Sequence, residues 1–320
     1  MGVIVGVDGG NTKTDVVVAS LDGEPLAYVR GPGSNSHGPS GSAGCVAVIA
    51  ALVDRISFQR PAAHAAFFLC GADSPQDVAE LSAEIEARAW APAATVDNDT
   101  FALLRAGSDA GDAIAVVCGA GINCVGRARD GRIARYPGLG WETGDWGGGE
   151  QLGREALFLA VRGEDARGRS TALTELVRTH FDLPSAVAVG EAVHYRRLRA
   201  TRLGEIAPRV VELAAAGDAV ARELVDRLAA EVALLVERAL RDLELGVADV
   251  VLGGGMLDGS GLLYELVVAA LPAGARPVVA DVPPVAGAAL AALDAADAAR
   301  AAGERLRAAF RRGLAPEDVR

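Results

Sequence analysis

The sequence is almost without lysine. Lys13 is the single lysine among 31 basic residues, so every other basic side chain is an arginine. The formal net charge of −11 argues against broad binding to nucleic acid or membrane surfaces, which requires a positive field. It leaves room for a phosphate ligand, because backbone dipoles and a metal ion can hold one inside an acidic protein.

Cysteine and long apolar runs are scarce as well. The four cysteines, Cys45, Cys70, Cys118 and Cys124, include no CxxC pair, and the few histidines are scattered. This spacing argues against a zinc site or a disulfide framework and predicts buried, reduced thiols. No stretch offers 18 consecutive apolar residues, and the N-terminus lacks the features of a signal peptide. We therefore expect a cytoplasmic protein without a membrane span.

One supersecondary pattern occurs twice, about 110 residues apart. Each copy is a short apolar strand, a glycine turn, a second strand, an Asp-Gly turn and a third strand, which predicts a three-stranded antiparallel meander. The predicted strands lie at 3–7, 14–20 and 25–30, and at 113–118, 123–128 and 132–136. A repeated unit is stronger evidence than either copy alone.

Helices and strands alternate after each meander, which implies parallel strands. In the first half we expect elements at 43–56, 65–70, 75–89, 94–97 and from 100, in the order helix, strand, helix, strand, helix. In the second half we expect helices at about 149–162, 170–179, 205–215 and 218–242, then strand 249–252, helix 260–270, strand 276–280 and a helix from about 285.

The sequence therefore predicts two α/β domains of βββαβαβα type. We place them at residues 1–112 and 113–320, the second with extra helices, and expect the last helix, from about 285, to pack back on the N-terminal domain. Facing glycine turns suggest a ligand in an interdomain cleft.

Three glycine turns each follow a predicted buried strand: DGGNTK at 8–13, GAGIN at 119–123 and GGGM at 253–256. Glycine lets the backbone approach a ligand, and successive N–H groups form a concave anion site. Thr12 and Lys13 can add a hydroxyl and an ammonium. Each turn alone could equally be a plain hairpin. GAGINCVG runs into a strand, where a dinucleotide-binding fold requires a helix.

Two further stretches carry acidic candidates. Asp99 follows strand 94–97, where doubly wound folds bind ligands, although residues 97–100 (DNDT) are also all helix-capping types. Asp145 lies between two tryptophans in PGLGWETGDWGGGEQLG, residues 137–153. Tryptophan beside aspartate suits a sugar, by apolar stacking and hydroxyl binding, while a flexible loop is the plain alternative.

Together these motifs resemble the BadF/BadG/BcrA/BcrD-type ATPases, which include N-acetylglucosamine kinases, within the actin/hexokinase/Hsp70 superfamily. The resemblance spans residues 3 to about 295, and rests most on GVDGGNTKTD, GSN at 33–35, DND at 97–99, GAGINC, GDWGGG at 144–149 and VVLGGG. It implies two ribonuclease-H-like (actin-like ATPase) domains around an interdomain cleft. It also implies an ATP-dependent phosphotransferase of N-acetylglucosamine kinase type that uses ATP and Mg²⁺.

The resemblance also assigns site residues. It implies that Asp8 holds Mg²⁺ through water, because Mg²⁺ keeps part of its hydration shell, and that Asp99 is the catalytic carboxylate. The phosphate-binding residues would be Gly9, Gly10, Asn11, Thr12, Lys13, Gly119, Ala120 and Gly121. The adenosine-binding residues would be Gly253, Gly254, Gly255 and Met256. The sugar-binding residues would be Asn35, Trp141 and Asp145.

The resemblance leaves the acceptor sugar open, because family members often read GDEGS where this chain reads GDWGG. We expect a small sugar as substrate, no nucleic-acid or membrane partner and, by similarity, a homodimer. One alternative is an ATPase that activates a 2-hydroxyacyl-CoA dehydratase-like partner, but the cysteines do not form a matching iron–sulfur set. A sugar-sensing repressor ranks last. The arginine-rich C-terminus reads as a solvated helical tail.

Overall fold

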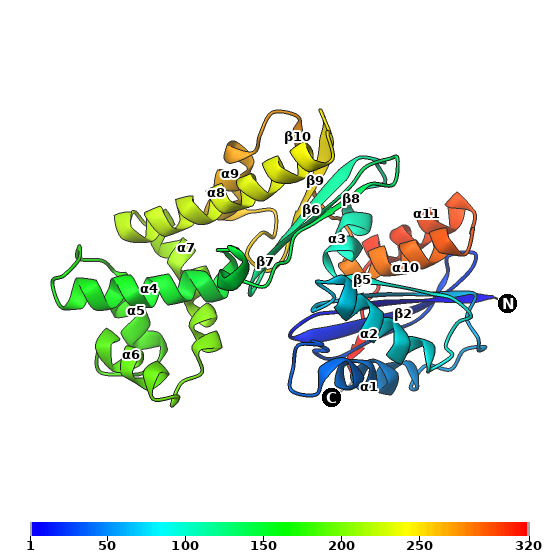
Figure 1. Cartoon of the computed structure of the whole chain (residues 1–320), viewed down its shortest axis with the longest axis horizontal. Helices are drawn as coiled ribbons and strands as arrows, with labels where there is room; N and C mark the ends of the chain where they lie inside the picture. The colour runs from blue at the N-terminus through cyan, green and yellow to red at the C-terminus, as the bar shows by residue number, and fades with distance from the viewer. Residues whose placement is uncertain (1, 319–320) are drawn as a thin grey trace. The chain divides into compact units, whose positions relative to one another are not determined.

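The computed structural model describes residues 2–318 of the chain, which form two compact units (Figure 1). Unit 1 comprises the described parts of Met1–Ala115 and Ala280–Arg320, and unit 2 comprises Val116–Val279. The sequence suggested a division near residue 112 with all of 113–320 in the second domain. In the structure, residues 280–318 pack with unit 1.

The sheet of unit 1 is built on the first predicted meander. Its strands are β1 (Val3–Gly9), β2 (Lys13–Ser20), β3 (Pro25–Pro32), β4 (His64–Leu69), β5 (Ala94–Asn98) and β11 (Glu317–Asp318). They lie in the order β11-β3-β2-β1-β4-β5. β1 pairs antiparallel with β2, and β2 with β3, while β4 pairs parallel with both β1 and β5. The carboxyl ends of β1, β4 and β5 therefore share one edge of the sheet.

Helices cover both faces of this sheet (Figure 1). They are α1 (Gly41–Val53), α2 (Pro75–Glu86), α3 (Thr100–Gly107), α10 (Pro284–Ala295) and α11 (Arg300–Arg311). The side chains of α1 and α2 join those of the strands in one apolar core. α10 packs on β1, β4 and α3. This contact requires Gly6, since a Cβ there would lie 2.4 Å from the Ala289 nitrogen.

Unit 2 repeats the topology of unit 1. Its strands are β6 (Ala113–Cys118, which begins in unit 1), β7 (Ile122–Arg127), β8 (Ile133–Arg135), β9 (Ala248–Gly253) and β10 (Ala275–Val279). The order β10-β9-β6-β7-β8 matches β5-β4-β1-β2-β3 of the first sheet, with β7 and β8 antiparallel and β9 and β10 parallel. The α/β fold predicted from the duplicated pattern, ribonuclease-H-like in each unit, is confirmed.

The extra helices of unit 2 lie between β8 and β9 in the sequence. They are η1 (Trp141–Thr143), α4 (Gly148–Glu164), α5 (Leu173–His180), α6 (Ala186–His194), η2 (Ala200–Ile206), α7 (Ala207–Ala215) and α8 (Ala219–Asp242), and α9 (Gly261–Ala270) follows β9. Asp218 caps α8 by accepting from the Val220 and Ala221 nitrogens. We did not predict α6, because it is short and has Gly190 in its interior.

The arginine-rich C-terminus is not the solvated tail that the sequence suggested. Arg307 is buried, and its guanidinium donates to the backbone oxygens of Ala106 at 2.5 Å and Arg105 at 2.8 Å. These oxygens belong to the last turn of α3, where helix carbonyls lack partners within the helix. The expectation was wrong because sequence spacing does not reveal that α11 packs where Arg307 can cap another helix.

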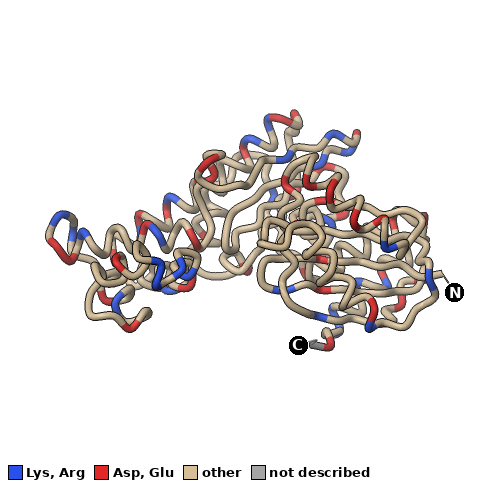
Figure 2. The backbone as a smooth tube through the Cα atoms, turned by 60° about the horizontal axis from the view of Figure 1, so that its bottom comes forward, with Lys and Arg blue, Asp and Glu red and all other residues tan. Residues whose placement is uncertain are grey.

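Charged residues are interspersed along the backbone of each unit (Figure 2). All four cysteines are free and buried, as the sequence predicted. Within residues 2–318, the helices fall short of the length and apolar character needed to cross a membrane.

Candidate active site

The first glycine turn is the tight hairpin between β1 and β2. Asp8 and Gly9 end β1, Lys13 begins β2, and the Gly10 nitrogen donates to the Lys13 oxygen at 2.9 Å. Asn11 and Thr12 are exposed at the tip. Gly9 has a packing role, because a Cβ there would lie 2.5 Å from Ser34 Oγ.

Lys13 is held from below by a buried carboxylate. Its Nζ lies 3.0 Å from Oδ2 of Asp15, whose side chain is fully buried. Arg30 on β3 donates to the same carboxylate twice, from Nε to Oδ1 at 2.7 Å and from Nη2 to Oδ2 at 2.9 Å. The Lys13 side chain nevertheless keeps 44% of its surface exposed. The Lys13 ammonium, predicted to bind phosphate, is thus both held in place by Asp15 and accessible to solvent.

Asn35 lies beside this turn. Its Nδ2 donates to Oδ1 of Asn11 at 2.5 Å, and its Oδ1 accepts from the His37 nitrogen at 2.7 Å. The Ser34 nitrogen donates to the Gly10 oxygen at 3.1 Å. Gly33 is required for this close approach, since a Cβ there would lie 2.1 Å from the Asn11 oxygen. The structure therefore places Asn35, predicted to bind the sugar, beside the turn that is predicted to bind phosphate.

Two candidate carboxylates, Asp8 and Asp99, follow the carboxyl edge of the first sheet. Burial, reinforced by the charges of Asp99 and Asp15, raises the pKa of Asp8 to about 8. Burial, with the charge of Asp73, raises the pKa of Asp99 to about 6. Desolvated carboxylates with other carboxylates as neighbours are typical of functional sites and favour a cation nearby.

The structure separates the two interpretations of residues 97–100. The first turn of α3 is capped by Asn98, whose Oδ1 accepts from the Thr100 nitrogen at 2.9 Å while its Nδ2 donates to Asp73 at 2.7 Å. Asp97 accepts from the Asn98 nitrogen at 2.7 Å. Asn98 thus supplies the side-chain cap and Asp99 makes none, although interactions with Thr100 partly offset the rise in the pKa of Asp99.

A single carboxylate such as Asp8 suits Mg²⁺, which commonly uses one or two protein carboxylates together with water and substrate phosphates. Within residues 2–318, no group of three or more His, Cys, Asp or Glu side chains is arranged to hold a metal ion.

The second glycine turn, in unit 2, is tied to the start of α4. The Gly119 and Ala120 oxygens accept from the Gly149 nitrogen at 2.7 Å and the Glu150 nitrogen at 2.9 Å. Gly119 and Gly121 have ordinary backbone angles, and no atom of the described residues lies within 4 Å of where their Cβ atoms would be. Neither packing nor backbone strain explains these glycines. Open space where a Cβ would intrude fits the approach of a ligand.

The third turn packs against the end of β6, directly before the second turn. The Met256 nitrogen donates to the Cys118 oxygen at 2.9 Å. Gly254 has φ +95°, and a Cβ there would lie 2.5 Å from the same oxygen. Gly255 has open space at its Cβ position among the described residues. The structure thus joins Gly253–Met256 to Gly119–Gly121 within unit 2.

The tryptophan-rich loop gives its two aromatic residues opposite environments. Trp141 is 70% exposed in η1, whereas Trp146 is 4% exposed, with the Arg227 guanidinium 3.9 Å from its ring centroid. Between them, Asp145 accepts a hydrogen bond from Thr143 Oγ1, and its nitrogen donates to Gly140 at 3.0 Å. Trp146 Nε1 is buried and has no hydrogen-bond partner among residues 2–318.

The loop returns to the second turn at its C-terminal end. Gly148 has φ +74°, and a Cβ there would lie 2.4 Å from the Gly121 backbone. Sequence reasoning selected Trp141 and Asp145 from this loop and missed Trp146, the residue that anchors it to α8. The sequence does show arginines along α8 that could stack on the indole ring of Trp146. Residue spacing alone could not show that Arg227 is the one that does.

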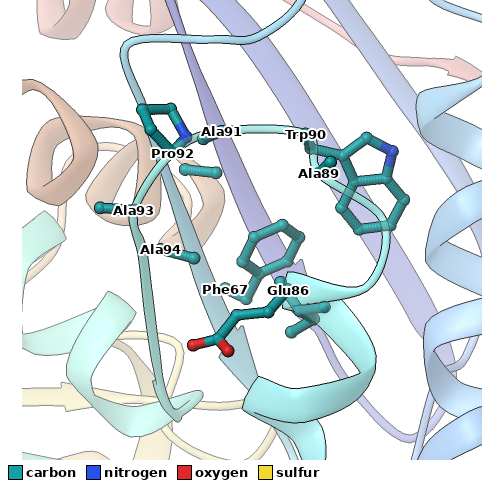
Figure 3. Close-up of a pocket in the computed structure, with 10 residues that line it drawn as sticks. Phe67, Glu86, Ala89, Trp90, Ala91, Pro92, Ala93 and Ala94 are labelled. Carbon is teal, nitrogen blue, oxygen red and sulfur yellow. The ribbon is translucent and has the colours of Figure 1, made fainter.

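Two cavities lie apart from these groups. One, of about 420 Å³ in unit 1, is lined mainly by alanines with Phe67, Trp90 and Glu86 (Figure 3). It lies where β5 begins, at Ala94, and Asp99 follows the other end of that strand. The second, of about 530 Å³ in unit 2, lies among α5, α6 and η2. Neither is lined by a residue that the sequence singled out.

Comparisons with known proteins agree with the fold and the motifs. The chain is 25% identical over 272 residues to the N-acetylmuramic acid/N-acetylglucosamine kinase of Clostridium acetobutylicum, covering 83% of this chain and 89% of the relative. It is 24% identical over 287 residues to the N-acetyl-D-glucosamine kinase of Dictyostelium discoideum, covering 82% and 88%.

Among solved structures, the fold resembles that of a candidate N-acetylglucosamine kinase from Chromobacterium violaceum. The TM-score is 0.71 at 22% identity, over 91% of this chain and 98% of that one. The sequence pattern of a whole family also matches residues 5–292, nearly the full span of the resemblance seen in the motifs. The chain belongs to the BadF/BadG/BcrA/BcrD ATPase family.

Proposed function

We propose that the protein is an ATP-dependent sugar kinase that phosphorylates N-acetylglucosamine or a related amino sugar or hexose. The observation that carries the proposal is the Asp99 carboxylate. It is desolvated, it follows β5 at the sheet edge where Asp8 lies next to the last residue of β1, and it makes no side-chain cap bond, because Asn98 supplies the cap. The curated relatives, both named as kinases of N-acetylated sugars, support this choice of acceptor.

In this proposal Asp99 accepts the proton of the sugar hydroxyl as the phosphoryl group is transferred. Such transfer requires a positioned acceptor, a carboxylate and cations near the migrating group. A raised pKa suits a base, because the base must bind a proton strongly enough to assist the attack while staying ionised at neutral pH. Asn35 and Asp145 would bind sugar hydroxyls, and Trp141 would stack on the ring.

The glycine turns would bind the nucleotide. Gly9 to Lys13 and Gly119 to Gly121 would hold the phosphates through backbone N–H groups and the Lys13 ammonium. Gly253 to Met256 would contact adenosine. Asp8 would hold Mg²⁺ through water, and the ion would supply neutralisation of phosphate charge. The glycines with open space at their Cβ positions, Gly119, Gly121 and Gly255, support this assignment.

The alternative of an iron–sulfur activator has little support in the described residues. Such a cluster requires thiolates. Cys118 and Cys124 are fully buried, and burial raises the pKa of both thiols above the ordinary value. We further propose a cytoplasmic homodimer with a small-molecule substrate and no nucleic-acid or membrane partner.

The test is an ADP-release assay over a panel of amino sugars and hexoses, with Mg²⁺ present. We expect release to depend on one class of sugar. A parallel thermal-shift panel identifies the acceptor independently, because ADP with the true acceptor raises the melting temperature by mass action. ADP release that is equal with and without every sugar would refute the kinase proposal.

A further inference from the structure

We propose that Asp15 is a positioning residue that orients the Lys13 ammonium toward the phosphates of the nucleotide. The inference rests on the proposed function, because it deepens the role of the first glycine turn. It concerns the last residue of the GVDGGNTKTD motif, to which the resemblance assigned no role: Asp15 lies two positions after Lys13, on a strand, with its side chain fully buried.

The register of the sheet places four charged side chains on one face. Asp15 is the direct cross-strand partner of Asp8 on β1 and of Arg30 on β3. Cross-strand partners share a face, and so do residues two apart on one strand, which adds Lys13. Two carboxylates opposite each other are destabilising by themselves, so the two cations compensate for a repulsion that the hairpin builds in.

Arg30 alone is sufficient to satisfy Asp15. Its guanidinium donates to both carboxylate oxygens in the bidentate geometry that fixes such a pair, at 2.7 Å and 2.9 Å. It also donates to the Tyr28 hydroxyl at 3.2 Å, which holds the fork in place. The buried carboxylate is therefore paired before Lys13 is counted, and Lys13 is not needed to neutralise it.

Lys13 then adds a positive charge that the Asp15–Arg30 pair does not consume. Asp15 and Arg30 cancel each other, so with Asp8 ionised the four side chains are formally neutral, and the half-buried Lys13 ammonium is the cation left to face Asp8 or a ligand. One of the three ammonium donors contacts Oδ2 of Asp15, at 3.0 Å, which leaves two for a ligand. The contact also restricts a side chain that is otherwise flexible, and that ordering lowers the entropic cost of binding.

The same geometry explains why this position is lysine in a chain that otherwise uses arginine. An arginine at residue 13 would present a planar fork that matches the Asp15 carboxylate and would compete with Arg30 for it. A compact ammonium touches one oxygen of Asp15 and keeps its remaining donors free. The surroundings of residue 13 therefore favour the compact charge of a lysine over the planar guanidinium of an arginine.

The test is a double-mutant cycle on the full chain, with kcat and both KM values measured for Asp15→Asn, Lys13→Met and the double variant. Asparagine keeps the size of the side chain but removes its charge. We expect Asp15→Asn to raise the KM for ATP about tenfold, as for loss of a charge-assisted hydrogen bond, and to leave the KM for sugar unchanged. In the Lys13→Met background the same change should have less than about a twofold effect.

Two further variants keep the test decisive if Asp15→Asn folds poorly. Lys13→Arg conserves charge at a partly exposed side chain, and should raise the KM for ATP several-fold, about as much as Lys13→Met. Asp54→Asn, which removes the carboxylate of the exposed Arg60–Asp54 pair, is the matched control and should change neither KM. Melting temperatures of all variants separate folding from binding.

Equal effects of Asp15→Asn in both Lys13 backgrounds, or an unchanged KM for ATP after Lys13→Arg, would overturn the inference. Calorimetric binding of a non-hydrolysable ATP analogue, run over the same cycle, makes the outcome independent of turnover. A protein that shows the coupling in binding but transfers no phosphoryl group to any sugar would refute the proposed function and leave the role of Asp15 standing.

Discussion

The two hairpins β1–β2 and β6–β7 occupy equivalent places in the two sheets but differ in chemistry. The first turn is surrounded by charge: Asp8 precedes it, Lys13 ends it, and Asp15 and Arg30 lie beneath it. The second turn, GAGIN, has no ionisable side chain, and its oxygens are tied to the first turn of α4. Under the proposed function, one topology would thus bind phosphate in two different ways.

The difference assigns distinct tasks to the two turns. Side-chain charges act over several ångströms and respond to pH and salt, whereas backbone donors act only in contact and depend on the absence of a Cβ. Ligand binding at the first turn should therefore depend chiefly on the charges of its side chains. The second should tolerate changes in neighbouring charge but not an added methyl group.

The largest expected effect is on the charged side, at Asp99. We expect Asp99→Asn to lower kcat by about 10²- to 10⁴-fold, the usual contribution of a general base, with the KM for ATP nearly unchanged. Asp97→Asn is the matched control, two residues away on the same strand end, and should change kcat by less than about twofold. Steady-state kinetics of both variants provide the test. Equal losses of kcat in the two variants would show that Asp99 is not the catalytic base.

The pH profile should show the same group. The base must be ionised, and burial raises the pKa of Asp99 to about 6. With saturating Mg²⁺ and ATP, when the cation keeps Asp8 ionised, kcat should therefore reach its plateau above pH 6 and fall about tenfold per unit below it. An ordinary aspartate would hold the plateau down to about pH 4. Asp73 also has its pKa raised to about 6, chiefly by burial, so the Asp73→Asn profile is the control. Because the charge of Asp73 also raises the pKa of Asp99, Asp73→Asn should move the limb to lower pH, whereas complete loss of the limb in this variant would assign it to Asp73.

A smaller effect is expected on the backbone side. Gly121→Ala adds one methyl group into space that the described residues leave open, so we expect an unchanged melting temperature and a rise of about tenfold in the KM for ATP. Gly148→Ala is the contrasting variant: its φ of +74° and a backbone contact at 2.4 Å predict a loss of stability instead. Thermal melts and kinetics measured together separate the two glycines. An unchanged KM for Gly121→Ala would make that turn a plain hairpin.

Much of the fold could be predicted because its signals are local. Apolar strands, Asp-Gly turns and the repeat near 110 residues specify the meanders, and these form as expected. What sequence spacing could not give are contacts between distant segments. Arg307 looks like any surface arginine until α11 brings it to the end of α3. Trp146 and Arg227 are 81 positions apart by their residue numbers, and only packing joins them.

The candidate site shows the same division. Glycine turns and the DND stretch are visible as motifs, but their accessory residues are not. Asn98, rather than Asp99, caps α3 by accepting a hydrogen bond from the Thr100 nitrogen. Asp15, buried in the sheet, accepts a hydrogen bond from the Lys13 ammonium. In sequence, Asn98 and Asp99 are equally good caps, and Asp15 is one charge in an apolar strand. Only the hydrogen bonds of the folded chain show which of the two, Asn98 or Asp99, caps the helix.

The measurement that tests the central claim most directly is the identity of the product. The protein is incubated with ATP, Mg²⁺ and N-acetylglucosamine, and the reaction is followed by mass spectrometry of the sugar together with ADP. The account predicts one sugar phosphate formed for each ADP released, and loss of both in Asp99→Asn. ADP formed without any sugar phosphate across the whole sugar panel, at a rate that survives Asp99→Asn, would contradict it.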